Sequence, residues 1–374
     1  MRVMDEDSTG DAAADAVEVD EDAERAERAA RRGRRASYIR FVAWIVFGAL
    51  VVTAGVYIWW QAKPSIADLR HQALLDTKSE LRIGVMSDMP GVSELDPATH
   101  TYRGFDIDIA YLVAADLGFR RDQVHFYTVS NEDREKASVL ADGKSVQLDM
   151  VIAAYSITDE RQRTPYVNFS SPYLRTEQSV VTLADHPDVH ALPDLTGKRV
   201  CTLGTSTSAS PASKAGIVVV LEDKISTCMK RLTETHDVDA VTTDAVILAG
   251  FLYQDTLANP GHPALKGHNI SLEGEELWGI STGGKTEDKE ALRKLVNLSL
   301  YKSQHDPNDT RWEEAFDRSL RVEQPASGDQ RVAIDQQPDA EKEDVRQWPW
   351  QNLGSGPTTR TTPRPNARRR RPVS

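Results

Sequence analysis

An uncharged and mostly apolar run of twenty residues, 41–60, constrains the fold of this chain more than any other segment. At a rise of about 1.5 Å per residue, a helix of that length spans about 30 Å, which is the thickness of a membrane's hydrocarbon core. Trp44 lies near its start and Trp59 and Trp60 lie at its end, as aromatic residues do at membrane interfaces. The run therefore predicts a transmembrane helix.

Basic residues lie mainly on the N-terminal side of this run. Five arginines fall within residues 31–40, whereas only Lys63 follows closely. The positive-inside rule then places the N-terminus in the cytoplasm and residues 61–374 outside the cell. A cleaved signal peptide is the alternative, but the apolar run is long and neither a small-x-small cleavage site nor a lipobox cysteine follows it. We therefore expect an uncleaved signal-anchor in the cell membrane.

Both ends of the chain have compositions that oppose a buried core. Residues 1–30 are rich in Asp, Glu and Ala, and we expect 1–40 to form a disordered cytoplasmic tail. Residues 61–79 would be a stalk. Residues 321–374 are rich in Pro, Gln, Asp, Arg and Thr and end in four consecutive arginines, which predicts a low-complexity tail. Such a cluster could contact anionic wall polymers or headgroups, although a solvated end is the simpler interpretation, and nucleic acid is not expected as a partner.

Between residues 80 and 320, short apolar strands alternate with helical patterns. The expected strands are 81–86, 148–154, 198–203 and 238–243, and the expected helices include 105–118 and 245–253. This alternation is typical of an α/β fold with mostly parallel sheets and helices on both faces. About 240 residues are too many for one sheet, so we expect more than one compact part.

The chain contains two cysteines, Cys201 and Cys228, and both lie on the expected outer side of the membrane. An even number in an oxidising compartment favours a disulfide, which would stabilise the fold by about 3–4 kcal/mol. Two buried free thiols are the alternative. No His or Cys stands around them at ligand spacing, so neither a metal site nor a cofactor is predicted.

Two motifs resemble those of the bacterial solute-binding proteins of family 3, which serve ABC importers of polar amino acids. The first runs from Gly104 to Ile109 (Gly-Phe-Asp-Ile-Asp-Ile) and continues as an apolar helix. The second runs from Ala154 to Arg161 (Ala-Tyr-Ser-Ile-Thr-Asp-Glu-Arg). Within the family, the likeness is to glutamate-binding proteins of actinobacteria, which have cysteines at matching positions and a run similar to residues 238–248.

The resemblance implies a two-lobed periplasmic-binding-protein type II fold, in which two hinge crossings join the lobes and the ligand lies in the cleft. Lobe 1 would comprise about 80–182 and 278–320, and lobe 2 about 186–274. The crossings would fall near 179–184 and 277–282. Closure of the hinge on the ligand would be the functional motion.

Arg161 is the first candidate site residue, because a guanidinium is a natural bidentate partner for a carboxylate. A surface arginine that pairs with Asp159 or Glu160 is the plainer alternative. The resemblance implies that Arg161 holds the α-carboxylate of an amino acid, beside the Ser156 hydroxyl and the Ala154 backbone.

Two further segments carry candidate residues. The loop 204–208 (Gly-Thr-Ser-Thr-Ser) is a hydroxyl-rich anion cradle without the Gly-Lys pair of a P-loop, and on its own it would be an ordinary turn. The resemblance assigns Thr205 and Ser206 to the same α-carboxylate. Asp244 lies between a strand and an apolar helix, where a simple N-cap is the alternative. The resemblance assigns its carboxylate to the ligand's α-amino group.

The side-chain pocket is less defined. Glutamate-binding relatives tend to place Lys or Arg after the first strand, where this chain has Met86, and Arg103 or Arg175 could supply the cation instead. No pattern of a catalytic triad is present, so we do not expect an enzyme. We expect a membrane-anchored extracellular protein that captures glutamate or glutamine and delivers it to an ABC permease. A receptor domain that senses an amino acid through a separate partner is the alternative.

Overall fold

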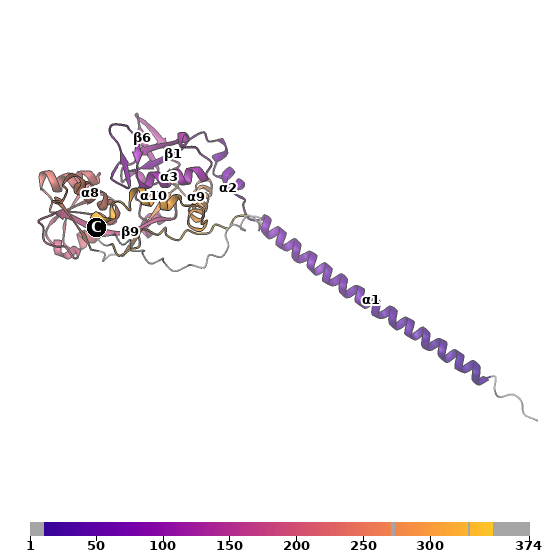
Figure 1. Ribbon diagram of the computed structural model, residues 1–374. Coiled ribbons are helices and arrows are strands. Elements are labelled where there is room, and N and C mark those ends of the chain that lie inside the picture. The colour runs from indigo at the N-terminus through magenta and orange to yellow at the C-terminus, as the bar shows by residue number, and fades with distance from the viewer. Residues whose placement is uncertain (1–10, 271–273, 328–329, 347–374) are drawn as a thin grey trace, which may run out of the picture. The chain divides into compact units, whose positions relative to one another are not determined.

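The computed structural model describes residues 11–270, 274–327 and 330–346 (Figure 1). The chain divides into two compact units, residues 1–63 and 64–374. The first contains helix α1, Asp11–Gln61. Its C-terminal part lies in Ser37–Thr77, the one segment of the described chain that is long and apolar enough to span a membrane.

Helix α1 begins far before the expected anchor and includes residues 11–40, where a disordered tail was expected. The helix continues through this stretch without a break. Ala, Glu and Arg dominate its composition, and these residues have some of the highest helix propensities. Residues 1–10 lie outside the described residues.

Residues 64–346 form two α/β lobes, each built on parallel strands, as expected. In lobe 1 the strand order is β5-β1-β8, with β1 parallel to both neighbours. In lobe 2 the order is β11-β10-β12, again parallel. The bounds are β1 Leu81–Val85, β5 Val124–Thr128, β8 Met150–Val151, β10 Arg199–Leu203, β11 Val218–Glu222 and β12 Ala240–Asp244.

Two long antiparallel strands join the lobes. Strand β9, Phe169–Leu183, pairs with β14, Glu275–Ser281, up to Glu177 and then with β12 and β13, Leu265–Asn269, from Gln178 onward. The hinge crossings therefore lie at residues 177–178 and between 269 and 275, several residues earlier than expected. The change of pairing partner occurs within one uninterrupted strand. The alternation of apolar and polar residues along a strand does not show which other strands it pairs with.

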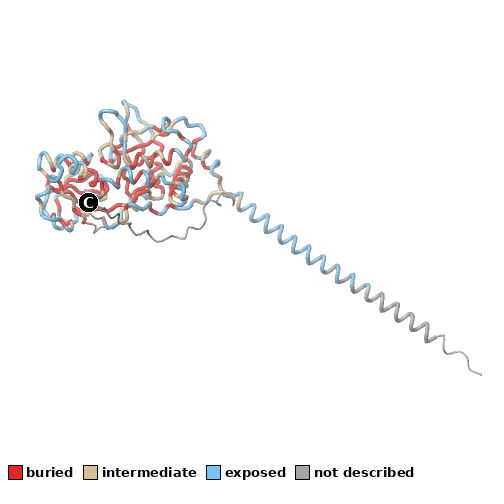
Figure 2. Tube along the Cα trace, viewed as in Figure 1, coloured by how far each residue is buried: buried red, intermediate tan, exposed pale blue. Residues whose placement is uncertain are grey.

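Helices cover both lobes, and each lobe has its own buried interior (Figure 2). Phe105, at the start of α3, is fully buried, with its ring centroid 5.7 Å from that of Trp312 and 6.3 Å from that of Phe316 in α10. The main helices are α2 Ile66–Gln72, α3 Phe105–Asp116, α8 Ala245–Ala258, α9 Glu287–His305 and α10 Arg311–Ser319.

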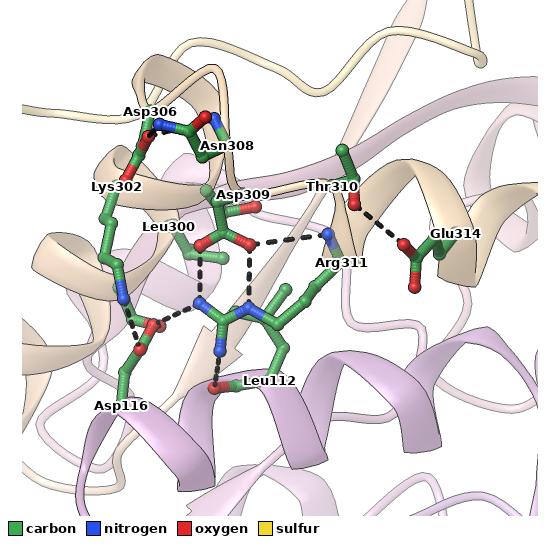
Figure 3. A network of polar contacts seen from close by, with 12 residues as sticks. Leu112, Asp116, Leu300, Lys302, Asp306, Asn308, Asp309, Thr310, Arg311 and Glu314 are labelled. Atoms are coloured by element: carbon green, nitrogen blue, oxygen red, sulfur yellow. Dashed lines mark hydrogen bonds and ion pairs between the residues drawn. The ribbon is translucent and has the colours of Figure 1, made fainter. Parts of the chain in front are cut away.

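A guanidinium fixes α10 against α3. Arg311 donates to the Leu112 carbonyl (3.3 Å) and to the carboxylates of Asp116 (2.8 Å) and Asp309 (2.5 Å) (Figure 3). Lys302 of α9 binds the same Asp116 carboxylate at 2.9 Å. Helices α9 and α10, which are consecutive in sequence, are thus held to the distant helix α3 at one cluster of charges.

The remaining elements are short. They are α4 Asp133–Lys136, α5 Asp159–Arg163, α6 Ala209–Lys214, α7 Ile225–Lys230 and α11 Gln324–Ser327, strands β2 Asp88–Met89, β3 Ser93–Leu95, β4 Tyr102–Arg103, β6 Ser138–Ala141 and β7 Lys144–Gln147, and helical turns at Leu75–Thr77, Arg121–Gln123, Leu192–Leu195 and Arg231–Thr235.

The expected stalk is partly folded into lobe 1. Leu69 of α2, together with Ala73 and Leu75 after it, is buried, and α2 packs against α9. Apolar side chains three to four residues apart give this helix one face to bury, which a stalk would not need.

Residues 321–346, which were expected to belong to a low-complexity tail, contact both lobes of the domain. Helix α11 packs against α8 of lobe 2, and the chain then returns to lobe 1 past the hinge, where the Arg331 amide donates to Glu177 at 2.9 Å. Ile334 and Ala340 are buried. A composition poor in apolar residues opposes an independent core, yet such a segment can still pair its backbone with an existing surface. Residues 347–374, with the four arginines, lie outside the described residues.

Candidate ligand-binding site

Arg161 lies in the first turn of α5, where the Thr158 hydroxyl caps the helix by accepting from the Arg161 amide at 3.2 Å. Its guanidinium donates to the Ser156 carbonyl in lobe 1 and to the Thr205 carbonyl in lobe 2, both at 2.7 Å. It also lies over the Tyr155 ring, 4.7 Å from the centroid. These partners compensate for a cation at a helix N-terminus. The alternative of a plain surface ion pair does not describe this arrangement.

Five of the six candidate residues line one cavity between the lobes. Its volume is about 10 Å³, which is about the space of one water molecule. A ligand larger than a water molecule would therefore fit here only if the lobes separated. The candidate residues in its lining are Ala154, Ser156, Arg161, Ser206 and Asp244, and the others are Met89, Arg134, Leu203, Thr207, Thr243 and Ile247.

The hydroxyl-rich loop contributes differently from the expectation. Thr205, the sixth candidate, contacts Arg161 through its carbonyl and lines a neighbouring pocket of about 660 Å³. Thr207 lines the cavity in addition to Ser206. Thr207 belongs to the same hydroxyl-rich run, so the sequence did indicate a polar residue at this position. The sequence of a turn does not show, however, which of the turn's side chains point into the cavity.

The backbone at Ala154 has a left-handed conformation, with a φ of 46°. The Asp106 carboxylate accepts from the Ala154 amide (2.9 Å) and from the Tyr173 hydroxyl (2.8 Å). Complete burial raises the pKa of Asp106 to about 7. The acidic residue of the first motif thus positions the segment from Ala154 to Ser156 instead of facing the cavity.

Asp244 ends β12 immediately before α8. Its side chain makes no capping hydrogen bond to that helix and instead accepts from the Trp278 indole N–H at 2.5 Å. The alternative of a simple N-cap therefore does not hold. Burial, and then the negative charge of Glu276, raise the pKa of Asp244 well above its usual value. A carboxylate in this situation gains strongly from a cation placed beside it.

Arg134 of α4 is a cavity residue that the sequence did not reveal. Its buried guanidinium donates to the carbonyls of Ala153 (3.1 Å) and Ala154 (3.2 Å) and lies 4.9 Å from the centroid of the Tyr155 ring. Burial, and then the neighbouring Arg161, lower its pKa to about 10, so it remains a cation at neutral pH. It stands in a run of Asp, Glu, Arg and Lys, which reads as a solvated surface.

Residues 81–318 match the model of the family of bacterial extracellular solute-binding proteins, family 3. The chain belongs to this family. Its members bind solutes, so the expectation of a binding protein instead of an enzyme is confirmed, as is the resemblance on which the site residues were chosen.

Several family members are similar in sequence. The glutamate-binding proteins GluB of Corynebacterium efficiens and Corynebacterium glutamicum are both 32% identical, over 179 and 181 residues respectively. In each case the match covers 46% of this chain, and the chain spans 58% of the relative's length. The glutamine-binding protein GlnH of Bacillus subtilis is 26% identical over 260 residues, covering 68% of this chain and 85% of that protein.

Solved structures confirm the two-lobed fold. An ancestral arginine-binding protein bound to glutamine is 28% identical, with a TM-score of 0.54 over 65% of this chain and 99% of that one. The cysteine-binding protein of Campylobacter jejuni is 22% identical, with a TM-score of 0.58 over 72% of this chain and 99% of that one, a likeness of fold alone.

The family site in this chain departs from two expectations about the side-chain pocket. Met86 is buried but does not line the cavity, where Met89 stands instead. Arg103 lies on the small sheet β2-β3-β4 and pairs with Glu94 at 2.8 Å, and Arg175 pairs with Glu275 at 3.0 Å. The short strands after β1 were not recognised in the sequence, and they determine which side chains reach the site.

The predicted disulfide is confirmed. Cys201 of β10 is bonded to Cys228 of α7, which links the sheet of lobe 2 to one of its covering helices. Within the described ranges, no group of His, Cys, Asp and Glu side chains could hold a metal ion.

Proposed function

We propose that this protein captures an acidic amino acid, glutamate in particular, by closing its two lobes around it. One observation carries the proposal: two guanidinium groups and a buried carboxylate line a single cavity between the lobes. Glutamate offers two carboxylates and one ammonium group, which are the complementary charges. Glutamine, with one carboxylate fewer, remains the second ligand of the proposal.

Each constant group of the ligand has a partner in this arrangement. Arg161 takes the α-carboxylate as a charge-assisted pair, with hydroxyls of Ser206 and Thr207 beside it. Asp244 takes the α-ammonium group, because a cation offsets the cost of keeping this carboxylate charged and buried. Arg134 is the cation for the side-chain carboxylate. Met86, at the position where relatives place this cation, is uncharged, and Arg103 does not line the cavity.

Contacts between the lobes support closure as the functional motion. The Ser226 amide of lobe 2 donates to Asp88 of lobe 1 at 3.0 Å, and Arg161 donates to Thr205 at 2.7 Å. These bonds form only when the lobes meet. A ligand with partners in both lobes shifts the equilibrium toward the closed form by its differential affinity for that form.

Delivery and location complete the proposal. The long apolar helix anchors the protein in the cell membrane with the binding domain outside. Tethering keeps the ligand-loaded domain near its partner, which we propose to be the permease of an ABC importer, by analogy with the family.

Calorimetry of the full chain in detergent, against the twenty standard amino acids, tests the proposal. We expect a dissociation constant in the micromolar range or tighter for glutamate. Arg134→Gln should weaken glutamate more than glutamine, because only glutamate loses a charged partner. The absence of a binding signal with all twenty amino acids would contradict the proposed function.

Amino-acid sensing is a second candidate, favoured by the C-terminal segment 321–346. This segment contacts α8 of lobe 2 and the hinge residue Glu177. It ends beside the start of the domain, where the Arg346 amide donates to the Pro64 carbonyl at 2.8 Å. A change in the angle between the lobes would therefore act on residues that directly follow the membrane helix in sequence.

A further inference from the structure

Glu276 is a carboxylate beside the cavity that has no counterpart in the expected site. It stands at the start of β14, just after the hinge crossing that leads from β13 into lobe 1. Its carboxylate accepts from the Ser156 hydroxyl of lobe 1 at 2.7 Å and from the Thr207 hydroxyl of lobe 2 at 2.8 and 2.9 Å. One side chain on the hinge thus binds both lobes at the cavity.

Strand geometry explains why Glu276 is close to Asp244. Residues two apart on a strand lie on the same face, and Trp278, two residues after Glu276, donates its indole N–H to Asp244. Ser156 forms an isolated bridge with Trp278, so this part of β14 lies against the site segment of lobe 1. Asp244, which lines the cavity, and Glu276, which lies beside it, therefore form a pair of neighbouring carboxylates.

The hydrogen bonds to Glu276 also orient the hydroxyls. Because Ser156 and Thr207 each donate their single hydroxyl proton to Glu276, their oxygen lone pairs remain as acceptors. An ammonium group has three N–H donors and no acceptor, so acceptor oxygens around it are what it requires. Both residues line the cavity into which such a group would enter.

We propose that Glu276 is a specificity-determining residue for the ligand's α-ammonium group, as a second carboxylate beside Asp244 that also positions the Ser156 and Thr207 hydroxyls. This inference rests on the proposed function and extends it to a choice between ligand classes. The site then offers two guanidinium groups for two ligand carboxylates and two carboxylates for one ammonium group.

Selection follows from charge. A dicarboxylate without an amino group would satisfy Arg134 and Arg161 but would leave Asp244 and Glu276 facing each other without a cation. Two like charges at close range in a buried site oppose each other strongly. The pair therefore excludes simple dicarboxylic acids while it admits an acidic amino acid, which is discrimination by repulsion as well as by attraction.

Calorimetry with L-glutamate and with glutarate, its analogue without the amino group, tests this inference on the full chain in detergent. The parent should bind glutamate far more tightly than glutarate. Glu276→Gln, which is isosteric and uncharged, should weaken glutamate at least about tenfold and leave glutarate unchanged or tighter. The ratio of the two affinities should therefore fall at least about tenfold.

Glu275→Gln is the matched control, because Glu275 lies on the same strand but is exposed and pairs with Arg175. It should change both affinities by less than about twofold. Thermal melting checks the fold of each variant. Should Glu276→Gln not fold, Glu276→Asp retains the charge on a shorter side chain and must still prefer glutamate to glutarate; loss of that preference overturns the inference.

With Glu276→Gln, three results overturn the inference. Glutamate binding to Glu276→Gln at parental affinity would show no role, and tighter binding of both ligands would show that Glu276 competes with the ligand for Ser156 and Thr207. Equal weakening of both ligands would show a structural role alone. A parent that binds no amino acid defeats the proposed function itself, which separates that failure from the other three.

Discussion

The two lobes contribute opposite chemistry to the cavity. Lobe 1 provides both guanidinium groups, Arg134 and Arg161, whereas lobe 2 provides Asp244 and the hydroxyls of Ser206 and Thr207. Apart from Glu276, which stands just after a hinge crossing, neither lobe alone has partners for both ends of an amino acid. On the proposed function, full affinity for the ligand therefore requires contacts from both lobes, so that ligand binding favours the closed form.

The lobes also differ in how they are stabilised. The largest fully buried side chains, which include Trp278, Trp312, Tyr173 and Phe105, all belong to lobe 1. The interior of lobe 2 consists mainly of smaller residues such as Val, Ala and Ile, and it contains the Cys201–Cys228 disulfide. A small core yields little stability, and a covalent cross-link compensates for it.

The largest expected effect concerns this second difference. Replacement of both Cys201 and Cys228 by serine should lower the stability of lobe 2 by about 3–4 kcal/mol, because the unfolded chain regains the freedom of a 27-residue loop. Hydrogen exchange should show lost protection in lobe 2 and retained protection in β1 and α3. Reductant should destabilise the parent but not the double variant, and equal melting of parent and variant would contradict the prediction.

Arg161→Ala should have the next largest effect, which is a loss of affinity for the ligand. The ligand carboxylate would remain buried without its guanidinium, at a cost of about 2–3 kcal/mol, or roughly 30–150-fold in affinity for glutamate. Arg163→Ala is the control, since Arg163 lies on the same short helix and is exposed. Binding by Arg161→Ala at the parental affinity would show that the Arg161 guanidinium does not contact the ligand.

Glu323→Gln should change the pH dependence of stability where the C-terminal segment meets lobe 1. Burial, and then Glu94, raise the pKa of Glu323 to about 8, and its Oε2 has no hydrogen-bond partner within the described residues. Since the unfolded chain loses this proton near pH 4.5 and the folded chain near pH 8, stability falls as pH rises through that window.

The variant should remove this fall and be more stable than the parent by about 1 kcal/mol at pH 8. Melting temperatures from pH 4 to pH 9 provide the measurement. Glu341→Gln, at an exposed position of the same segment, should follow the parental curve. If the melting temperatures of Glu323→Gln and the parent depend on pH in the same way, the environment of Glu323 does not disfavour the charged carboxylate.

The smallest effect is expected at the end of the segment. Arg346 pairs with Asp68 at 3.2 Å on a partly exposed surface, and such pairs contribute about 0.5 kcal/mol. Arg346→Ala should therefore lower the melting temperature of the binding domain by a few degrees at most. A fall in melting temperature as large as that caused by removing the disulfide would mean that lobe 1, too, depends strongly on an interaction outside its hydrophobic core.

Short-range patterns allowed much of the fold to be predicted. The apolar run 41–60 and the β-α alternation depend on residues close in sequence, and the structure contains the corresponding helix and strands. It also contains a helix at residues 11–40, where a disordered tail was expected, and packs residues 321–346, expected as a low-complexity tail, on the domain. Composition alone does not show helix continuation or a surface on which to pack.

What the sequence determined by itself is the class of the protein: an apolar helix, an α/β binding domain and a disulfide. Only the tertiary structure placed Arg134 in the lining of the cavity and Glu276 beside it, and located one hinge crossing within β9 and the other between β13 and β14. The reason is the range of the contacts, since the Ser156 hydroxyl and the Glu276 carboxylate meet across 120 residues of chain. Periodicity and motifs describe neighbours, whereas a closed site depends on which distant surfaces the strands bring together.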